Sequence, residues 1–409
     1  FKMLELEINL TGSVEDFVAH NGPKFSYSNK PLGNELFFYS TAFLIDQGIQ
    51  DISINVSNTE KYPIFFQVNA ESAMPFDIFA ASFYLISRYE EYLPHLKDAS
   101  GRFCFEESIA FKNNFLDKPI IDIWVIELAE IINIKLKTTI KESKKNKNII
   151  PVFEVSEPYM FQNKSIFLSF FQALNSIWNL NFKNLINQVY VLFRLSKDPY
   201  LEYDFITDQF NNIKIDLLGF FRYTQHSIDI GAISIFNSSY KLLIKNISDK
   251  IFISLLVSSF AQKNIKILKN EMKNLTKLTH RNSQKVRLNL GILSISEIYP
   301  MLVQSEVLED YSMGYIDQIG YRASTSIPFY YYDLINEVQS SLKVYPVAIT
   351  EFALRKLSVK NAFEVMKEYL LKLPLENSIF CFAFTPKLLS QSSENLLWRS
   401  SFLKFINEI

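Results

Sequence analysis

From residue 149 onward, short apolar runs alternate with helical stretches, and this alternation constrains the fold more than any other feature of the sequence. The apolar runs are predicted strands at residues 151–156, 213–221, 251–257, 286–290, 344–349 and 379–384. The stretches between them are predicted helices at residues 164–195, 264–278, 296–304 and 359–373. The pattern predicts an α/β sheet or barrel, whose functional residues would lie at the C-terminal ends of the strands.

The first 140 residues have a different pattern. Strand-like runs at residues 4–10, 36–42 and 52–56 precede a predicted helix at 78–92, which Pro94 ends, and a second helix at 120–136. A polar, lysine-rich stretch at residues 137–148 has no apolar periodicity and is the best candidate for a linker. A chain of 409 residues is too long to fold around one ordinary hydrophobic core. We therefore expect an α+β domain over residues 1–140 and an α/β domain over residues 149–409.

The composition excludes several classes of protein. A net charge of −1 argues against a nucleic-acid partner, and no run of 18 apolar residues predicts a membrane span. We find no secretory signal peptide, so we expect a soluble, cytoplasmic protein, although the chain begins with Phe1 rather than Met. Cys104 and Cys381 lie far apart without a CxxC pair, and we expect buried free thiols.

Residues 310–329 are the most distinctive loop candidate. They hold Gly314 and Gly320, two of only 10 glycines, together with hydroxyl and aromatic side chains around Arg322. This composition predicts two strand ends joined by a tight loop. Such a loop is either a functional site at the rim of the sheet or a structural loop whose arginine pairs with a carboxylate.

Histidine and carboxylate side chains offer few metal sites. Arg88, Glu90 and Glu91 precede His95, a grouping that suggests either a metal site or, as we favour, a solvated or ion-paired face near a helix end. The four histidines, His20, His95, His226 and His280, contain no pair at the i, i+4 spacing of a helical metal site. We interpret His226 and His280 as surface loop residues.

Three segments resemble bacterial polysaccharide deacetylases that carry an extra N-terminal domain. They are PFDIFAASFYLISRYEEYLPHLKDASGRF at residues 75–103, DKPIIDIW at 117–124 and EDYSMGYIDQIGYRASTSIPFYYYDL at 309–334. The resemblance implies a distorted (β/α) barrel that hydrolyses N-acetyl groups on glycans. It also implies a divalent metal such as zinc, held by an aspartate and two histidines, which would activate water. An aspartate base, an orienting arginine and a histidine acid complete the family site.

The matched positions depart from this pattern. Glu154 stands where the family has its base, and Ser156 replaces the metal-ligating aspartate. Leu256 replaces a metal-ligating histidine, and Thr385 replaces the acid. Arg322 is retained and is predicted to pair with Glu154 or Glu351. Glu154 and Arg322 are therefore vestigial catalytic candidates, and the sequence predicts no bound metal or other cofactor.

Three hypotheses follow. The favoured one is a pseudoenzyme with a groove in which Tyr311, Tyr315, Tyr321 and Arg322 contact a glycan. The second is an active deacetylase whose ligands have moved, for which the candidates are Glu154, Glu157, His226 and Asp229. The third is a partner-binding scaffold whose groove is filled by Leu256, Phe260 and Phe384.

Overall fold

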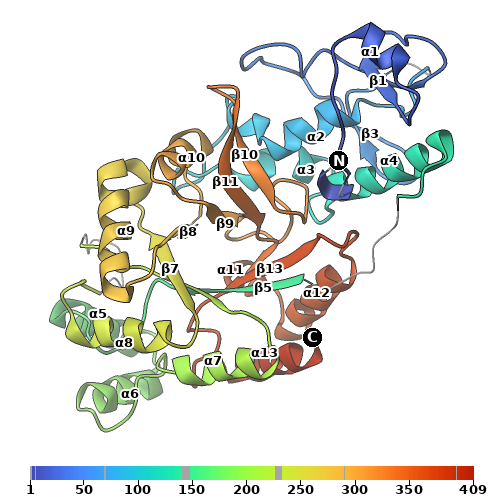
Figure 1. Ribbon diagram of the computed structural model, residues 1–409. Coiled ribbons are helices and arrows are strands. Elements are labelled where there is room, and N and C mark those ends of the chain that lie inside the picture. The colour runs from blue at the N-terminus through green and yellow to red at the C-terminus, as the bar shows by residue number, and fades with distance from the viewer. Residues whose placement is uncertain are drawn as a thin grey trace.

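The computed structural model describes residues 2–4, 6–68, 71–140, 148–225, 233–289, 291–392 and 394–409, and Figure 1 shows how they are arranged. Part of the predicted linker, residues 141–147, lies outside the described residues.

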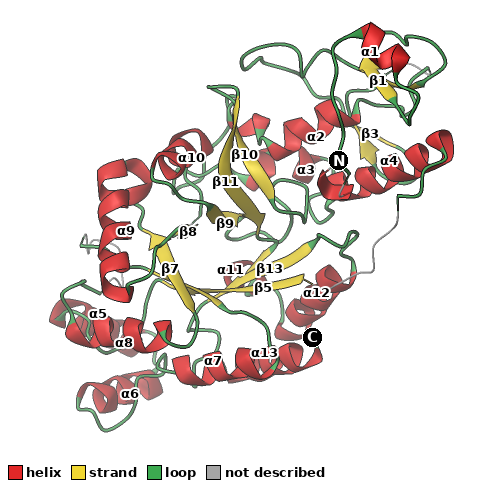
Figure 2. Ribbon diagram, in the orientation of Figure 1, coloured by secondary structure: helices red, strands yellow, loops and turns green. Residues whose placement is uncertain are grey.

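A curled sheet of nine strands occupies the centre of the structure (Figure 2). Its strands are, in chain order, β5 (Asn148–Val155), β6 (Leu218–Phe221), β7 (Phe252–Val257), β8 (Lys285–Leu288), β9 (Glu309–Met313), β10 (Phe329–Asp333), β11 (Val338–Pro346), β12 (Ile349–Thr350) and β13 (Ile379–Phe384). They pair in the order β10-β11-β9-β8-β7-β6-β5-β13-β12, and only the β10–β11 pair is antiparallel. The expected mixed α/β architecture is confirmed.

The chain between β11 and β12 links two strands that are far apart in the sheet order. Val347 N donates to Met313 O of β9 (2.8 Å), and Ala348 N donates to Cys381 O of β13 (3.1 Å). The curled sheet is therefore barrel-like. Gly314 permits this approach, because a Cβ there would collide with the carbonyl oxygen of Val347.

Side chains fill the concave face of the sheet. This interior cluster consists of Val152, Leu218, Phe220, Leu256, Tyr311, Val347, Ile379, Cys381 and Ala383. A small barrel filled in this way leaves no room for a ligand between the strands. Any binding site of the sheet must therefore lie outside this interior.

Helices cover the convex face, where a second and larger core forms. They are α7 (Tyr203–Asn212), α8 (Ser238–Ser248), α9 (Ile265–Thr279), α10 (Ile295–Gln304), α11 (Glu351–Leu354), α12 (Val359–Leu371) and α13 (Leu396–Glu408), with a 3₁₀ turn, η4 (Ala261–Lys263). Two further helices, α5 (Ile166–Trp178) and α6 (Phe182–Leu192), pack on each other and contribute no residue to this core. Capping sets their ends: the Asn264 side chain accepts from the backbone of Lys266 and Ile267, and α9 begins there. Leu268 and Leu275, seven residues apart, turn the same helix face to the core.

The residues before 141 have a core of their own around Phe65, Phe76 and Trp124. Their elements are η1 (Lys2–Leu4), α1 (Val14–Ala19), β1 (Phe25–Ser28), β2 (Leu36–Tyr39), β3 (Ser57–Asn58), β4 (Pro63–Ile64), α2 (Ile78–Ile86), η2 (Tyr89–Glu91), η3 (Phe105–Glu107), α3 (Ile109–Lys112) and α4 (Ile120–Leu136). Tyr315 and Leu334, from the later part of the chain, join this core.

Buried polar contacts hold the N-terminal part against the loop between β9 and β10. The Asp122 carboxylate accepts from the hydroxyls of Thr325 and Ser326, each at 2.5 Å. Tyr321 N donates to Leu116 O at 2.8 Å. Two of the segments that resemble the deacetylase family, residues 117–124 and 309–334, therefore meet at this contact.

Several predicted elements agree with the structure and others do not. The strand at residues 379–384 and the helix at 120–136 are confirmed. Residues 2–4 form a 3₁₀ turn, so a strand over residues 4–10 is wrong, and the strand predicted at 52–56 instead lies at residues 57–58. The helix predicted at 78–92 ends at Ile86, because Arg88 adopts a left-handed conformation with φ 55°. The strand ends predicted for residues 310–329 are those of β9 and β10, although the loop between them is long rather than tight.

Candidate functional site

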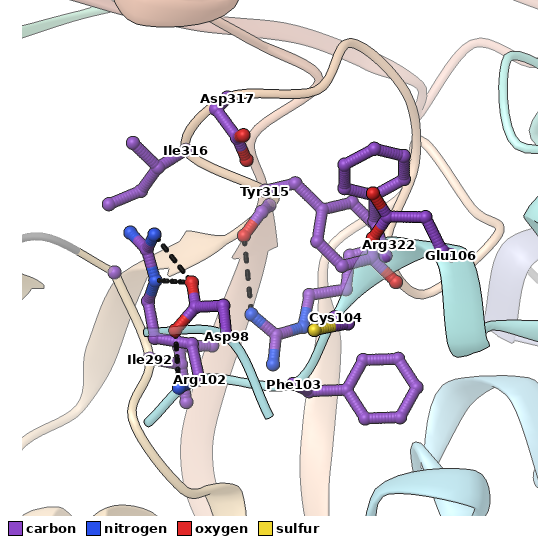
Figure 3. Close-up of a pocket in the computed structure, with 13 residues that line it drawn as sticks. Asp98, Arg102, Phe103, Cys104, Glu106, Ile292, Tyr315, Ile316, Asp317 and Arg322 are labelled. Atoms are coloured by element: carbon purple, nitrogen blue, oxygen red, sulfur yellow. Dashed lines mark hydrogen bonds and ion pairs between the residues drawn. The ribbon is translucent and has the colours of Figure 1, made fainter. Parts of the chain in front are cut away.

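A pocket of about 140 Å³ lies at the C-terminal edge of the sheet (Figure 3). It is lined by Asp98, Arg102, Phe103, Cys104, Phe105, Glu106, Gly291, Ile292, Gly314, Tyr315, Ile316, Asp317 and Arg322. Residues 98–106 belong to the N-terminal part, whereas the others follow β8 and β9. Parallel strands place their C-terminal ends at one edge, and these loops therefore meet there.

Arg322 forms one wall of the pocket and is held rigidly. Its guanidinium makes two hydrogen bonds to Glu91, Nη2 to Oε2 at 2.6 Å and Nε to Oε1 at 2.9 Å. It also lies 5.2 Å from the centre of the Tyr315 ring. Burial opposes its charge, but the Glu91 carboxylate outweighs that effect, and the pKa of Arg322 is raised. Arg322 is thus a fixed cation.

The predicted pairing of Arg322 with Glu154 or Glu351 is wrong. Its partner Glu91 also receives Nε of Arg88 at 2.7 Å. Arg88 donates to the carbonyl oxygen of Arg322 and pairs with Glu90 at 2.9 Å. These four residues form an ion-paired cluster as expected, but the cluster is buried rather than solvated. Arg88 has a left-handed conformation just after α2; beyond it, Glu91 reaches Arg322, whereas Glu90 accepts from the backbone of Ile109.

The pocket lining also carries a paired carboxylate, Asp98. The Asp98 side chain accepts from Nε of Arg102 at 2.6 Å and from the backbone of Ser100 and Arg102. Burial raises the pKa of Asp98, but the hydrogen bonds from Arg102 and Ser100 outweigh it, so the net pKa is lowered. Asp98 is therefore an anion, and Figure 3 shows it paired with Arg102.

Cys104 lines the same pocket, but its thiol is not activated. Burial raises its pKa, and the carboxylates of Glu106, Asp98 and Glu107 raise it further. A thiol in such surroundings stays protonated near neutral pH and is a poor nucleophile. Cys104 and Cys381 are both free, as predicted, although only Cys381 is fully buried.

Glu154 lies away from the pocket. Its carboxylate pairs with Nε of Arg287 at 2.7 Å, and Nη1 of Arg287 donates to Tyr311 O at 2.5 Å. Both charged side chains are buried. Arg287 was not singled out from the sequence.

The two other candidates of this strand end have partners as well. The Ser156 carbonyl oxygen accepts from Arg222 at 2.8 Å, and Glu157 lies 4.0 Å from Lys164.

The residues at the family's metal and acid positions do not fit a metal. Leu256 is fully buried in the interior cluster. Thr385 donates to the Glu351 carboxylate through its backbone N–H (2.9 Å) and its hydroxyl (2.7 Å), and Glu351 also pairs with Arg355. Across the described ranges, no three His, Cys, Asp or Glu side chains are placed to hold a metal ion. A catalytic zinc site needs about three such ligands.

The remaining candidates are dispersed. Among the tyrosines, only Tyr315 lines the pocket; Tyr311 stacks on Tyr345 at 4.3 Å, and Tyr321 stacks on Tyr369 at 5.5 Å. Phe384, expected in the groove, instead packs in the core under the helices.

The histidines are scattered as well. His95 Nδ1 lies 2.8 Å from Leu93 O, and exposed His280 ends α9. His226 and Asp229 lie outside the described residues.

Comparisons with known proteins found a family model and a similar solved structure. The model of a family of unknown function, DUF7033, matches residues 1–137. Among solved structures, a "putative polysaccharide deacetylase from Mycobacterium smegmatis" is similar at a TM-score of 0.39 and 14% sequence identity, over 66% of this chain and 85% of that chain. No curated protein matches. These similarities assign no activity to this chain.

Proposed function

We propose that this chain is a glycan-binding, deacetylase-like protein that has lost hydrolytic activity. Residues 1–140 would form its α+β domain, and residues 149–409 its distorted (β/α) barrel domain. The observation that carries the proposal is the ion pair between Glu154 and Arg287 at 2.7 Å. A general base must reach the water that it activates, whereas this carboxylate is held in the sheet interior by an arginine.

The neighbouring positions support the same conclusion. The resemblance places a metal-ligating aspartate at Ser156 and a metal-ligating histidine at Leu256. It places the acid at Thr385, and the three positions here carry two hydroxyls and one aliphatic side chain. A hydroxyl is a weak ligand for a zinc-like cation, which prefers imidazole, thiolate or carboxylate. The residues present therefore do not form a metal centre.

The pocket supplies the binding site in this proposal. A dry cavity of about 150 Å³ holds a benzene molecule, so a pocket of about 140 Å³ fits one ring-sized group. Phe103 and Tyr315 offer aromatic faces, and Asp98 and Asp317 offer hydrogen-bond acceptors. Apolar walls with a few fixed polar groups are typical of small-ligand sites. We infer that a terminal sugar of a glycan occupies it.

The first experiment is calorimetric titration with N-acetylglucosamine oligosaccharides, with acetate release measured on the same samples in the presence of added zinc. We expect heat of binding without acetate. Acetate release that Glu154→Gln abolishes would instead support the hydrolase with relocated ligands. Absence of binding would favour the scaffold hypothesis.

Two variants locate the binding site. Asp98→Asn should weaken binding about tenfold or more, because it removes an anionic hydrogen-bond acceptor from the pocket wall. Lys112→Gln is the control, since Lys112 is paired with Glu107 at the surface and does not line the pocket. Equal affinities of both variants and the wild type would place the glycan elsewhere.

A further inference from the structure

A concentrated apolar surface covers the hairpin formed by α5 and α6. Between Ile166 and Leu195, fifteen large apolar side chains are exposed, among them Ile166 at 89% and Trp178 at 88%. The hairpin lies at one corner of the molecule, toward the lower left of Figure 1, far in that view from α3 and α4. Contiguous exposed apolar surface of this extent marks an interaction site.

The contact between the two helices is polar. The Gln188 side chain donates to Ser169 O at 2.7 Å, and the Asn184 side chain donates to Ser176 Oγ at 3.3 Å. The buried positions of the two helices are Ser176 at 5% exposure, Gln188 at 2% and Val191 at 1%, and two of these three are polar. A hairpin in water buries its apolar face and exposes its polar face. In this hairpin most of the apolar side chains are instead exposed, and hydrogen-bonding side chains join the two helices, as is typical of helices in lipid.

Neither helix crosses a membrane. α5 has 13 residues and α6 has 11, whereas a span needs about 20. No helix among the described residues is both long and apolar enough to span. An apolar surface on short helices suits the interface of a bilayer, where amphipathic segments lie in the plane of the headgroups and an exposed tryptophan is favoured.

The charge of the hairpin identifies its partner. Residues 163–197 contain four basic residues, Lys164, Lys183, Arg194 and Lys197, and no Asp or Glu, although the whole chain has a net charge of −1. Lys164 lies near Glu157, whereas the other three are exposed. Basic side chains beside an apolar surface complement anionic headgroups. In a symmetric dimer the same surface would meet itself, which would bring these like charges together.

We propose that the α5–α6 hairpin is an interfacial anchor that binds the surface of an anionic phospholipid bilayer. Its exposed apolar side chains enter the boundary between headgroups and acyl chains, and Lys183, Arg194 and Lys197 contact the lipid phosphates. The proposal does not depend on the pocket or on any glycan.

Vesicle co-sedimentation with the full chain tests the proposal. We expect binding to vesicles of phosphatidylglycerol and phosphatidylcholine, and weak or no binding to phosphatidylcholine alone. The triple variant Lys183→Gln/Arg194→Gln/Lys197→Gln should lower the partition coefficient roughly a hundredfold, at about fivefold for each charge. The control is Lys112→Gln/Lys118→Gln/Lys135→Gln, which removes the same number of exposed charges from α3, α4 and their connection and should bind like the wild type.

Tryptophan fluorescence provides a second readout. Trp178 is exposed, whereas Trp124 and Trp398 are buried, so a blue shift on adding anionic vesicles reports entry of the hairpin into the bilayer. Trp178→Phe should abolish the shift while keeping most of the binding.

Two outcomes would overturn the proposal. One is equal sedimentation of the triple variant and the wild type with anionic vesicles. The other is a wild type that ignores vesicles but forms a dimer in light scattering that Phe170→Ser/Trp178→Ser dissociates, which would assign the surface to a second copy.

Discussion

Nη2 of Arg322 lies 2.6 Å from Oε2 of Glu91, and the two residues are separated by 231 positions in the chain. Both side chains are almost completely buried. The pair joins the loop after β9 to η2, which follows α2, and so it sets the position of the pocket wall relative to the N-terminal part. Loss of this ion pair should therefore lower the stability of the folded protein.

Arg322→Met should therefore be strongly destabilising. The change leaves the Glu91 carboxylate buried with only Arg88 beside it, and removal of one partner of a buried pair typically costs about 3–5 kcal/mol. Urea unfolding followed by circular dichroism measures the loss. The control is Lys356→Met, since Lys356 and Asp317 form an exposed pair whose loss should cost no more than about 1 kcal/mol. Similar costs for both variants would mean that the buried pair does not hold the two parts together.

Stability should fall in acid because of Glu91. Burial raises its pKa, but Arg322 and Arg88 lower it more, to about 2 from 4.5. The carboxylate thus contributes stability above pH 4.5 that is lost as the pH falls toward 2, roughly 3 kcal/mol in all. Unfolding free energies measured between pH 2 and 5 should show this slope in the wild type, and Glu91→Gln should flatten it. A variant with the wild-type slope would assign the acid sensitivity to other carboxylates.

Asp310 should produce the opposite pH dependence at higher pH. Burial raises its pKa to about 6, although Ser312 and Tyr299 donate hydrogen bonds to it. A carboxyl group with a raised pKa binds its proton more tightly when folded, and it reduces stability as the pH rises from about 4 to about 6. Asp310→Asn should remove part of that decrease in the unfolding free energy. An unchanged slope between pH 4 and 6 would show that Asp310 titrates normally in the folded protein.

The regular elements could be predicted where the apolar pattern was unambiguous. β13 is apolar throughout, and α4 repeats apolar residues at helical spacing, so both were located correctly. β9 was not among the predicted strands, although a strand end was expected near residue 310, because Asp310 and Ser312 interrupt its apolar pattern. The burial of these polar groups is compensated by a hydrogen bond between them (2.5 Å) and by bonds from Tyr299 and Leu288. Local periodicity does not reveal such a compensation.

The site was less predictable than the fold. The pocket brings residues 98–106 beside Arg322, and no local signal joins segments so far apart in the chain. Arg322 was matched to Glu154 by analogy, but Arg287 takes that carboxylate because it lies on β8, facing the same interior.

Gly320→Ala should destabilise the contact between the loop and the N-terminal part. Gly320 has φ +143°, which other residues avoid, and an added Cβ would lie 2.6 Å from Leu116 O. Strain of this kind costs about 1–3 kcal/mol. Gly101→Ala is a matched control, because Gly101 has φ +83° but nothing within 4 Å of the added Cβ. Thermal unfolding should separate the two, and an equal loss would show that backbone strain alone, without the collision, sets the cost.

Variants of the Glu154–Arg287 pair can show whether these two residues stabilise the fold or contribute to the binding site. Glu154→Ala should cost about 3–5 kcal/mol of stability, since it leaves the Arg287 cation buried without its partner. The double variant Glu154→Leu/Arg287→Met should recover much of that loss, because apolar residues of similar volume often replace a buried ion pair without penalty. Urea unfolding of both variants measures the recovery, and the double variant should still bind N-acetylglucosamine oligosaccharides. If it regains stability but loses the ligand, the pair contributes to the site, and the proposed division between a structural interior and a binding pocket at the strand ends is wrong.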